Sequence, residues 1–239
     1  MNERLITAAL ATAVLSGSAL ADARVRAVHA SPDAPNVDVL VDGSIAFPDA
    51  PFTGVTDYAT LPADTYNVQV VPTGMMGPVV IDENLALDSG VDYSVVAVGQ
   101  LADIAPLVLV DDNALDPANA RVRFVHASPN APAVDIALAG GGAVLFDDFS
   151  FTEASSYLSV APGDYDLEVR LAGTSDVVLS LGEVSLSGNT VYSVFAMGLV
   201  GDNDAPLQAV FSVDAIPSPG ALAVMAMGGL IASRRRRSV

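Results

Sequence analysis

The stretch that decides the fold occurs twice, as "ARVRAVHASPDAPNVDV" at residues 23–39 and "ARVRFVHASPNAPAVDI" at residues 120–136. Thirteen of these seventeen positions are identical. Further along, "VDYSVVAVG" from residue 91 matches "TVYSVFAMG" from residue 190. An internal repeat of this length indicates a repeated structural unit. The sequence therefore predicts two copies of one domain, at residues 22–111 and 120–215, joined by a linker at 112–119.

Strict alternation of apolar and polar residues predicts β-strands in each copy. In "YDLEVRL" at residues 165–171, every second side chain is apolar and the others are charged. Proline, glycine and aspartate separate such segments, and no helical periodicity occurs between the two ends of the chain. We predict an all-β protein of two tandem antiparallel β-sandwich domains, immunoglobulin-like or transthyretin-like. Tyr66 and Tyr165 follow tight turns, which is typical of a tyrosine corner.

The same alternation assigns faces within the repeated stretch. Val122, Phe124 and His126 share one face of their strand, whereas Arg121 and Arg123 share the other. The first copy has the same arrangement. We therefore expect each histidine to point into the core and to bond the backbone of the following Ser-Pro turn. The arginines are expected to point outward, and each copy is expected to fold alone.

The repeated motif also contains the residue types of a hydrolase triad, with serine as nucleophile, histidine as base and aspartate as orienting group. The residues are His29, Ser31 and Asp38 in the first copy and His126, Ser128 and Asp135 in the second. Neither serine lies in a glycine-flanked nucleophile turn. We therefore favour a structural role for the motif and do not expect an enzyme; a hydrolase acting on an extracellular polymer is the alternative.

Composition excludes several functions. The formal net charge is -18, lysine and cysteine are absent, and there are two histidines. Such a surface repels nucleic acid, and the chain offers neither a thiolate site nor the ligands of a zinc site. No cofactor is expected. Calcium is the one metal for which oxygen ligands are available, with Asp202, Asn203 and Asp204 as candidates; a solvated acidic turn is the alternative.

Both ends of the chain are predicted to be targeting signals. Residues 1–21 contain a short apolar run followed by Ala19-Leu20-Ala21, which is typical of a secretory signal peptide cleaved after Ala21. Residues 216–239 contain a second apolar run that is followed directly by Arg234, Arg235, Arg236 and Arg237. In an exported chain, such a run stops transfer and the arginines remain in the cytoplasm. We expect the segment to anchor the protein transiently in the inner membrane.

Two resemblances support this interpretation. Pro217-Ser218-Pro219, the apolar run and the four terminal arginines together resemble the PEP-CTERM sorting signal of Gram-negative bacteria, with serine in place of the middle glutamate. The two copies of "ARVRxVHASPxAPxVD" resemble the bacterial domain of unknown function 4397, found in exported and cell-surface proteins. The resemblances imply the Sec export machinery, signal peptidase and an exosortase-like protease as partners. The predicted function is a cell-surface or extracellular protein that acts by binding or as a structural component, with exopolysaccharide or other surface proteins as partners.

Overall fold

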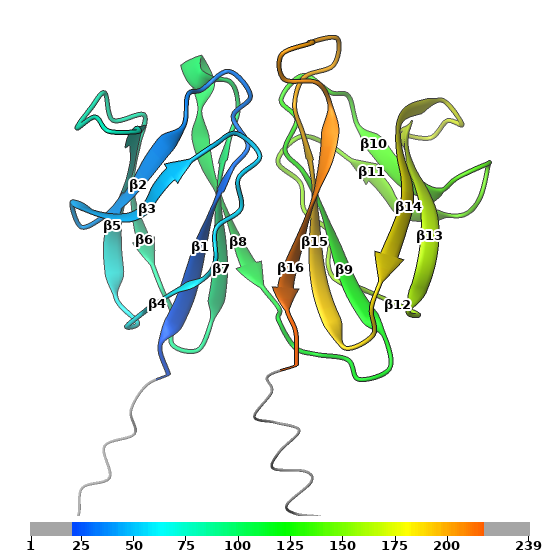
Figure 1. Cartoon of the computed structure of the whole chain (residues 1–239), viewed down its shortest axis with the longest axis horizontal. Helices are drawn as coiled ribbons and strands as arrows, with labels where there is room; N and C mark the ends of the chain where they lie inside the picture. The colour runs from blue at the N-terminus through cyan, green and yellow to red at the C-terminus, as the bar shows by residue number, and fades with distance from the viewer. Residues whose placement is uncertain (1–20, 218–239) are drawn as a thin grey trace, which may run out of the picture.

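The computed structural model describes residues 21–217, which form two β-sandwich domains (Figure 1). The first contains β1 (Ala23–His29), β2 (Val37–Val41), β3 (Ser44–Ala50), β4 (Ala59–Leu61), β5 (Thr65–Pro72), β6 (Ile81–Ala86), β7 (Asp92–Val98), the short 3-10 helix η1 (Leu101–Asp103) and β8 (Ala105–Asp111). The second contains β9 (Ala120–His126), β10 (Val134–Leu138), β11 (Val144–Phe149), β12 (Leu158–Val160), β13 (Gly163–Leu171), β14 (Val177–Leu186), β15 (Thr190–Met197) and β16 (Gln208–Ala215). The predicted all-β tandem fold is confirmed.

The two domains have the same topology. In the first, the sheet β4-β1-β7-β8 packs on the sheet β3-β2-β5-β6; in the second, β12-β9-β15-β16 packs on β11-β10-β13-β14. All strand pairs are antiparallel except β1 with β7 and β9 with β15, which are parallel. The expected tyrosine corners are present, since the Tyr66 hydroxyl donates to the Pro62 carbonyl at 3.0 Å and Tyr165 donates to Ala161 at 2.7 Å.

Each domain has its own apolar core between its two sheets. In the first domain the core includes Val25, Val39 and Val70. In the second, Phe124 is 1% exposed and its ring packs edge-on against Phe149, 5.7 Å between centroids. These residues all lie on the apolar faces that the alternation predicts. Their burial removes the apolar surface from water and supplies most of the stability of each sandwich.

A third apolar core joins the two domains. Its buried members come from one sheet of each domain, namely β4-β1-β7-β8 and β12-β9-β15-β16, which we call the facing sheets. They are Val28, Ala30, Val96, Val98, Val125, Ala127, Phe195 and Met197, all at most 3% exposed. The facing sheets are therefore covered on both sides, because each packs on its own domain and on the other domain.

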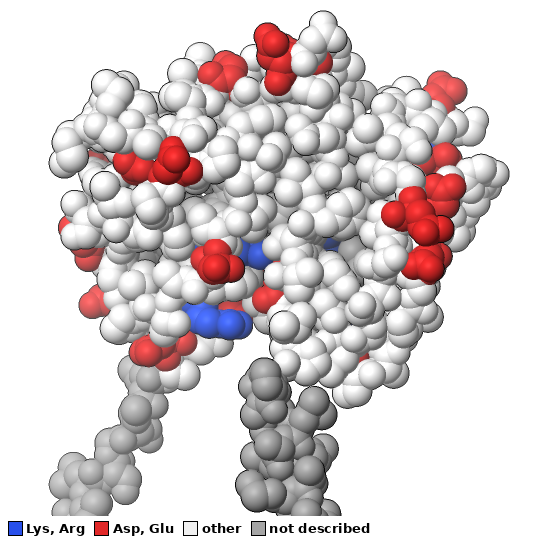
Figure 2. Space-filling model, in the orientation of Figure 1, with Lys and Arg blue, Asp and Glu red and all other residues white. Residues whose placement is uncertain are grey.

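The long strands of the facing sheets run from one end of the molecule to the other, as Figure 1 shows, whereas β4 and β12 are short. β1 starts, and β8 and β16 finish, at the same end, which also holds the 112–119 linker. The described chain thus enters and leaves at one end. Figure 2 shows acidic side chains spread over the outer surface in that view, whereas the arginine side chains in view gather at the boundary between the domains. Within residues 21–217, no helix is long and apolar enough to cross a membrane.

Candidate functional site

The two motif histidines are buried at the ends of β1 and β9. His29 is 1% exposed and its Nε2 lies 3.0 Å from the Pro35 carbonyl oxygen, while His126 is 0% exposed and lies 3.1 Å from the Pro132 carbonyl oxygen. Each contact requires a proton on Nε2, so the ring closes the Ser-Pro turn as the sequence predicts. Burial lowers the pKa of both rings, which favours the neutral form.

Ser128 and the motif aspartates bond to other parts of the fold, whereas the Ser31 hydroxyl has no hydrogen-bond partner in the described part of the chain. Ser128 Oγ donates to the Gly198 carbonyl at 2.6 Å, and Ser31 is fully buried. Asp38 accepts from the backbone amides of Asp49 and Gly74, at 2.8 and 2.9 Å. Asp135 does the same in the second domain, where it accepts from Asp148 and Gly173 at the same two distances.

The aspartate contacts stabilise an unusual backbone. Asp49 and Asp148 adopt positive φ values of 49° and 57°, which non-glycine residues seldom do. Both lie in edge strands whose pairing with β2 and β10 is interrupted by a bulge. The motif aspartates therefore hold a bulge and a turn in place. Within residues 21–217, no hydrogen bonds join serine, histidine and aspartate into a catalytic relay.

The candidate calcium residues form a turn. The Asp202 carboxylate accepts from the backbone amides of Asp204 and Ala205 at 2.8 and 2.9 Å, and these bonds lower its pKa. Among the described residues, no group of three or more histidine, cysteine, aspartate or glutamate side chains is placed to hold a metal ion. The local contacts of this loop, which includes Asn203, are those of an aspartate turn, the alternative that the sequence offers to a calcium site.

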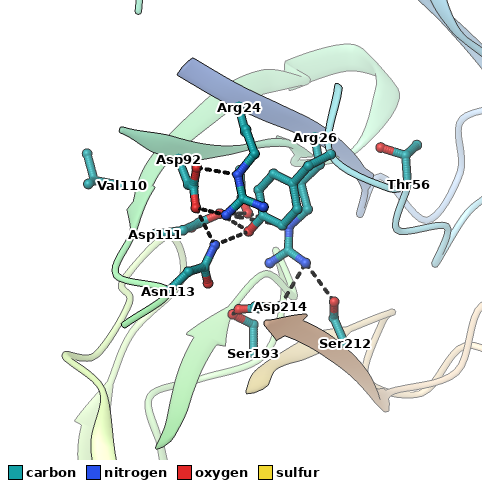
Figure 3. Close-up of polar contacts among 12 residues, drawn as sticks. Arg24, Arg26, Thr56, Asp92, Val110, Asp111, Asn113, Ser193, Ser212 and Asp214 are labelled. Atoms are coloured by element: carbon teal, nitrogen blue, oxygen red, sulfur yellow. Dashed lines mark hydrogen bonds and ion pairs between the residues drawn. The ribbon is translucent and has the colours of Figure 1, made fainter. Parts of the chain in front are cut away.

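Arg26 and Arg123, the second arginines of the two "ARVR" segments, are buried in a polar site between the domains. Arg26 is 1% exposed, and its Nη1 lies 2.8 Å from Asp214 Oδ1 and 2.7 Å from Ser212 Oγ, both on β16 of the other domain (Figure 3). Within its own domain, Arg26 Nε donates to Ser94 Oγ at 2.7 Å, and Ser94 donates to Asp111 at 2.6 Å. One guanidinium thus bridges the strand-end aspartates of both domains.

Arg123 makes the reciprocal set of contacts. Its Nη2 donates to Asp111 Oδ1 at 2.7 Å and its Nη1 to the Val110 carbonyl at 3.2 Å, both on β8 of the first domain. Its Nε donates to Ser193 Oγ at 3.0 Å, and Ser193 donates to Asp214 at 2.5 Å. The two contact sets are related as in a two-fold symmetric dimer, in which residue i meets j and j meets i.

A tyrosine completes each half of this cluster. The guanidinium carbon of Arg26 lies 4.7 Å from the centre of the Tyr58 ring, and that of Arg123 lies 5.0 Å from the Tyr157 ring. Burial raises the pKa of both phenols, so both remain protonated. Tyr58 donates to Asp111 at 2.5 Å, and Tyr157 donates to the equivalent aspartate at 3.3 Å. We call these two arginines, two aspartates, three serines and two tyrosines the interdomain polar cluster.

The prediction of outward-facing arginines is therefore wrong for Arg26 and Arg123, because the other domain covers the face on which they lie. It holds for Arg24, whose side chain is 44% exposed and pairs with Asp92 of its own domain. The linker is also held in place: Arg121 donates to the Asp112 carboxylate at 2.7 Å and to the Ala114 carbonyl at 2.6 Å. The sequence did contain a signal for this cluster. Both copies carry the second arginine of "ARVR" and an aspartate near the end of their last strand.

Comparison with known families agrees with this architecture. The chain matches the domain of unknown function DUF4397 over residues 23–137 and over residues 138–225. It belongs to this family, with two adjacent matches along the chain. The first match continues through β9 and β10, so its limit differs from the boundary between the sandwiches, which lies at residues 112–119. A search of curated proteins found no match to this chain.

The buried histidines predict a pH dependence of stability. An unfolded histidine has a pKa of about 6.5, and the folded rings have lower values because they are buried. As the pH falls below about 6.5, the unfolded chain therefore takes up protons first, and the free energy of unfolding decreases. The aspartates whose pKa is lowered, Asp38 among them, lose their contribution only near or below their ordinary 3.8. Urea denaturation between pH 7 and pH 5 measures this decrease.

The double variant His29→Ala/His126→Ala provides the control. We expect it to be less stable by about 1–3 kcal/mol per site, because each change removes a buried ring and its hydrogen bond to the proline carbonyl. Its free energy of unfolding should also depend much less on pH between 7 and 5. An unchanged slope in the variant would show that other groups titrate in this range.

Proposed function

We propose that this chain is an exported, non-enzymatic protein of the bacterial envelope or extracellular matrix, which acts by binding or as a structural component. The proposal rests on the hydrogen bonds that the motif side chains make. The histidines and aspartates of both copies bond the backbone, and Ser128 does so as well, which leaves them engaged in holding loops together. No observation favours the hydrolase alternative.

The position of the chain ends supports attachment at one end of the molecule. Ala21, after which signal cleavage is expected, accepts from Ser89 Oγ at 2.6 Å, at the end where β1 starts. Pro217, at which the sorting segment starts, follows shortly after β16, which finishes at the same end (Figure 1). Ala19, Ser218, Pro219 and the terminal arginines lie outside the described residues. With this end toward the membrane, the opposite end is presented outward.

The outward end includes four loops that residues of the repeated motif connect in pairs. Asp33 of the first Ser-Pro turn accepts from the Leu101 amide at 2.7 Å. In the second domain, the side chain of Asn130 accepts from the Val200 amide at 2.8 Å and donates to its carbonyl at 3.2 Å. The two turns therefore support the loops at 99–104 and 198–206. We propose that this supported end, with its acidic side chains, meets the surface partner, either exopolysaccharide or another surface protein, with divalent cations bridging acidic groups where both sides carry them.

Removal of residues 218–239 tests the location. We expect the shortened chain to appear as soluble protein in the periplasm or medium of a Gram-negative host, with the same melting temperature as the full chain after processing. The control lacks only Arg234 to Arg237, and should still reach the membrane. The released protein should leave the length of an added extracellular polysaccharide unchanged. A shortened chain that stays in the inner membrane, a full chain retained in the cytoplasm, or a shortened polymer would each contradict the proposal.

A further inference from the structure

The facing sheets are nearly equivalent in charge but not in shape. Both domains contribute one buried arginine, one strand-end aspartate, one bridging serine and one tyrosine to the interdomain polar cluster. The apolar positions of β1 and β9 are also the same, because Val28 and Ala30 correspond to Val125 and Ala127. These parts of the surface would fit a copy of themselves as well as they fit the other domain.

The strands at the middle of the interface differ in size. The repeat aligns Val96 and Val98 of β7 with Phe195 and Met197 of β15, and all four side chains are at most 3% exposed. β1 meets β16 through Arg26, and β8 meets β9 through Arg123. β7 lies between β1 and β8, and β15 lies between β16 and β9, so β7 faces β15. The small pair of the first domain thus opposes the large pair of the second.

The facing sheets differ at a second position, which Arg26 contacts. β8 and β16 pair with their neighbours so that Leu109 lies opposite Ser94 and Ser212 lies opposite Ser193, which makes Leu109 and Ser212 equivalent positions. Arg26 donates to Ser212 at 2.7 Å. In a pair of two first domains, Arg26 would meet leucine at this position and would bond the neighbouring Val110 carbonyl instead, as Arg123 does at 3.2 Å. The difference in side-chain size between β7 and β15 is therefore the stronger basis for selecting a partner.

From these observations we propose that the facing sheets form a partner-selective pairing surface. The interdomain polar cluster sets the register, while the sizes of Val96 and Val98 against Phe195 and Met197 select the second repeat as partner of the first. Two first repeats would leave voids where valine faces valine, and two second repeats would crowd phenylalanine and methionine against themselves. The partner that fits the first repeat is a second repeat, from the same chain or from another copy of it.

Cutting the linker tests the choice of partner. A site-specific protease sequence is inserted after Leu115 in the full chain, and the protein is cut after folding. We expect the halves to remain together as a one-to-one complex in native mass spectrometry. After an isotope-labelled and an unlabelled cut protein are mixed, new complexes should combine a first half with a second half only. Separation of the halves at micromolar concentration, or like-with-like pairs at the statistical ratio, would overturn the proposal.

Exchanging the side chains tests the same inference without cutting. Phe195→Val/Met197→Val should lower the melting temperature by about 10 °C, since it leaves a cavity. Val96→Phe/Val98→Met should also lower it, through crowding. The protein with all four substitutions should have a melting temperature within about 3 °C of the parent, because the side chains of β7 and β15 are again complementary in size.

Val194→Ala is the matched control, because Val194 lies on the same strand as Phe195 but packs into the core of its own domain. We expect the loss in this variant to be unaffected by Val96→Phe/Val98→Met. Additive losses in the four-substitution protein, or equal rescue of Val194→Ala, would show that the interface does not select by size.

Discussion

Arg26→Ala is expected to lower the free energy of unfolding by about 3–5 kcal/mol, because it leaves the buried Asp214 carboxylate with only the more distant Arg123, 4.0 Å away, as its cation. The Arg26 guanidinium contacts the Asp214 carboxylate and the Ser212 hydroxyl across the domain boundary, and all three residues are at most 9% exposed. Water cannot replace the lost partner without opening the interface. Urea denaturation of the parent and the variant measures the difference.

Arg24→Ala is the matched control for this prediction. Arg24 belongs to the same strand, and its ion pair with Asp92 lies within one domain and is partly exposed. We expect a loss below about 1 kcal/mol, as for other surface pairs. The double variant Arg26→Ala/Asp214→Ala should lose less than the sum of the single variants, because the uncompensated charge is removed. Equal losses for Arg24→Ala and Arg26→Ala would contradict a special role for the interdomain polar cluster.

Phe124→Ala is expected to destabilise the chain by about 3–5 kcal/mol through the cavity that it leaves. The Phe124 ring packs against Phe146, Phe149 and His126 in the second domain. The first domain has Ala27 at the equivalent position, so Ala27→Gly serves as a control of smaller volume in the matching strand. Because the third apolar core couples the domains, the loss should be felt in both of them.

Hydrogen exchange measured by mass spectrometry separates the two outcomes. If the shared core couples the domains, the slowest amides of β5 and of β13 should lose protection together in Phe124→Ala. If the domains unfold independently, only β13 should be affected. The second outcome would support the expectation from sequence that each copy folds alone. The buried contacts between the facing sheets argue against that expectation.

The fold could be predicted from sequence because it depends on local alternation and on the repeat. The strand faces of "YDLEVRL" and the inward histidines follow from a period of two, which holds within any half-buried strand. The outward side of β1 and β9 could not be assigned in this way. Alternation separates one face from the other but does not reveal that a second domain covers the polar face. Arg26 and Arg123 therefore look like solvent-facing residues until the two sheets are placed together.

The candidate site shows the same limit. Asp38 and Asp135 lie in the same repeated motif as the histidines, which makes a catalytic relay conceivable from residue types alone. Their actual partners are the amides of Asp49 and Asp148, whose position depends on a bulge in the neighbouring strand. Such a bulge leaves no clear signal in a single sequence, because it is set by pairing between strands.

The arrangement of the chain ends has a mechanical consequence. β16 finishes at the end where the chain leaves the described domains, and it pairs antiparallel with β15 along most of its length. A load applied between that end and the loops at the opposite end runs parallel to these strands, so it shears their hydrogen bonds all at once. Pulling at right angles to the strands would instead break the bonds one after another. A protein held at one end and bound at the other therefore carries tension in the direction in which its sheets resist it best.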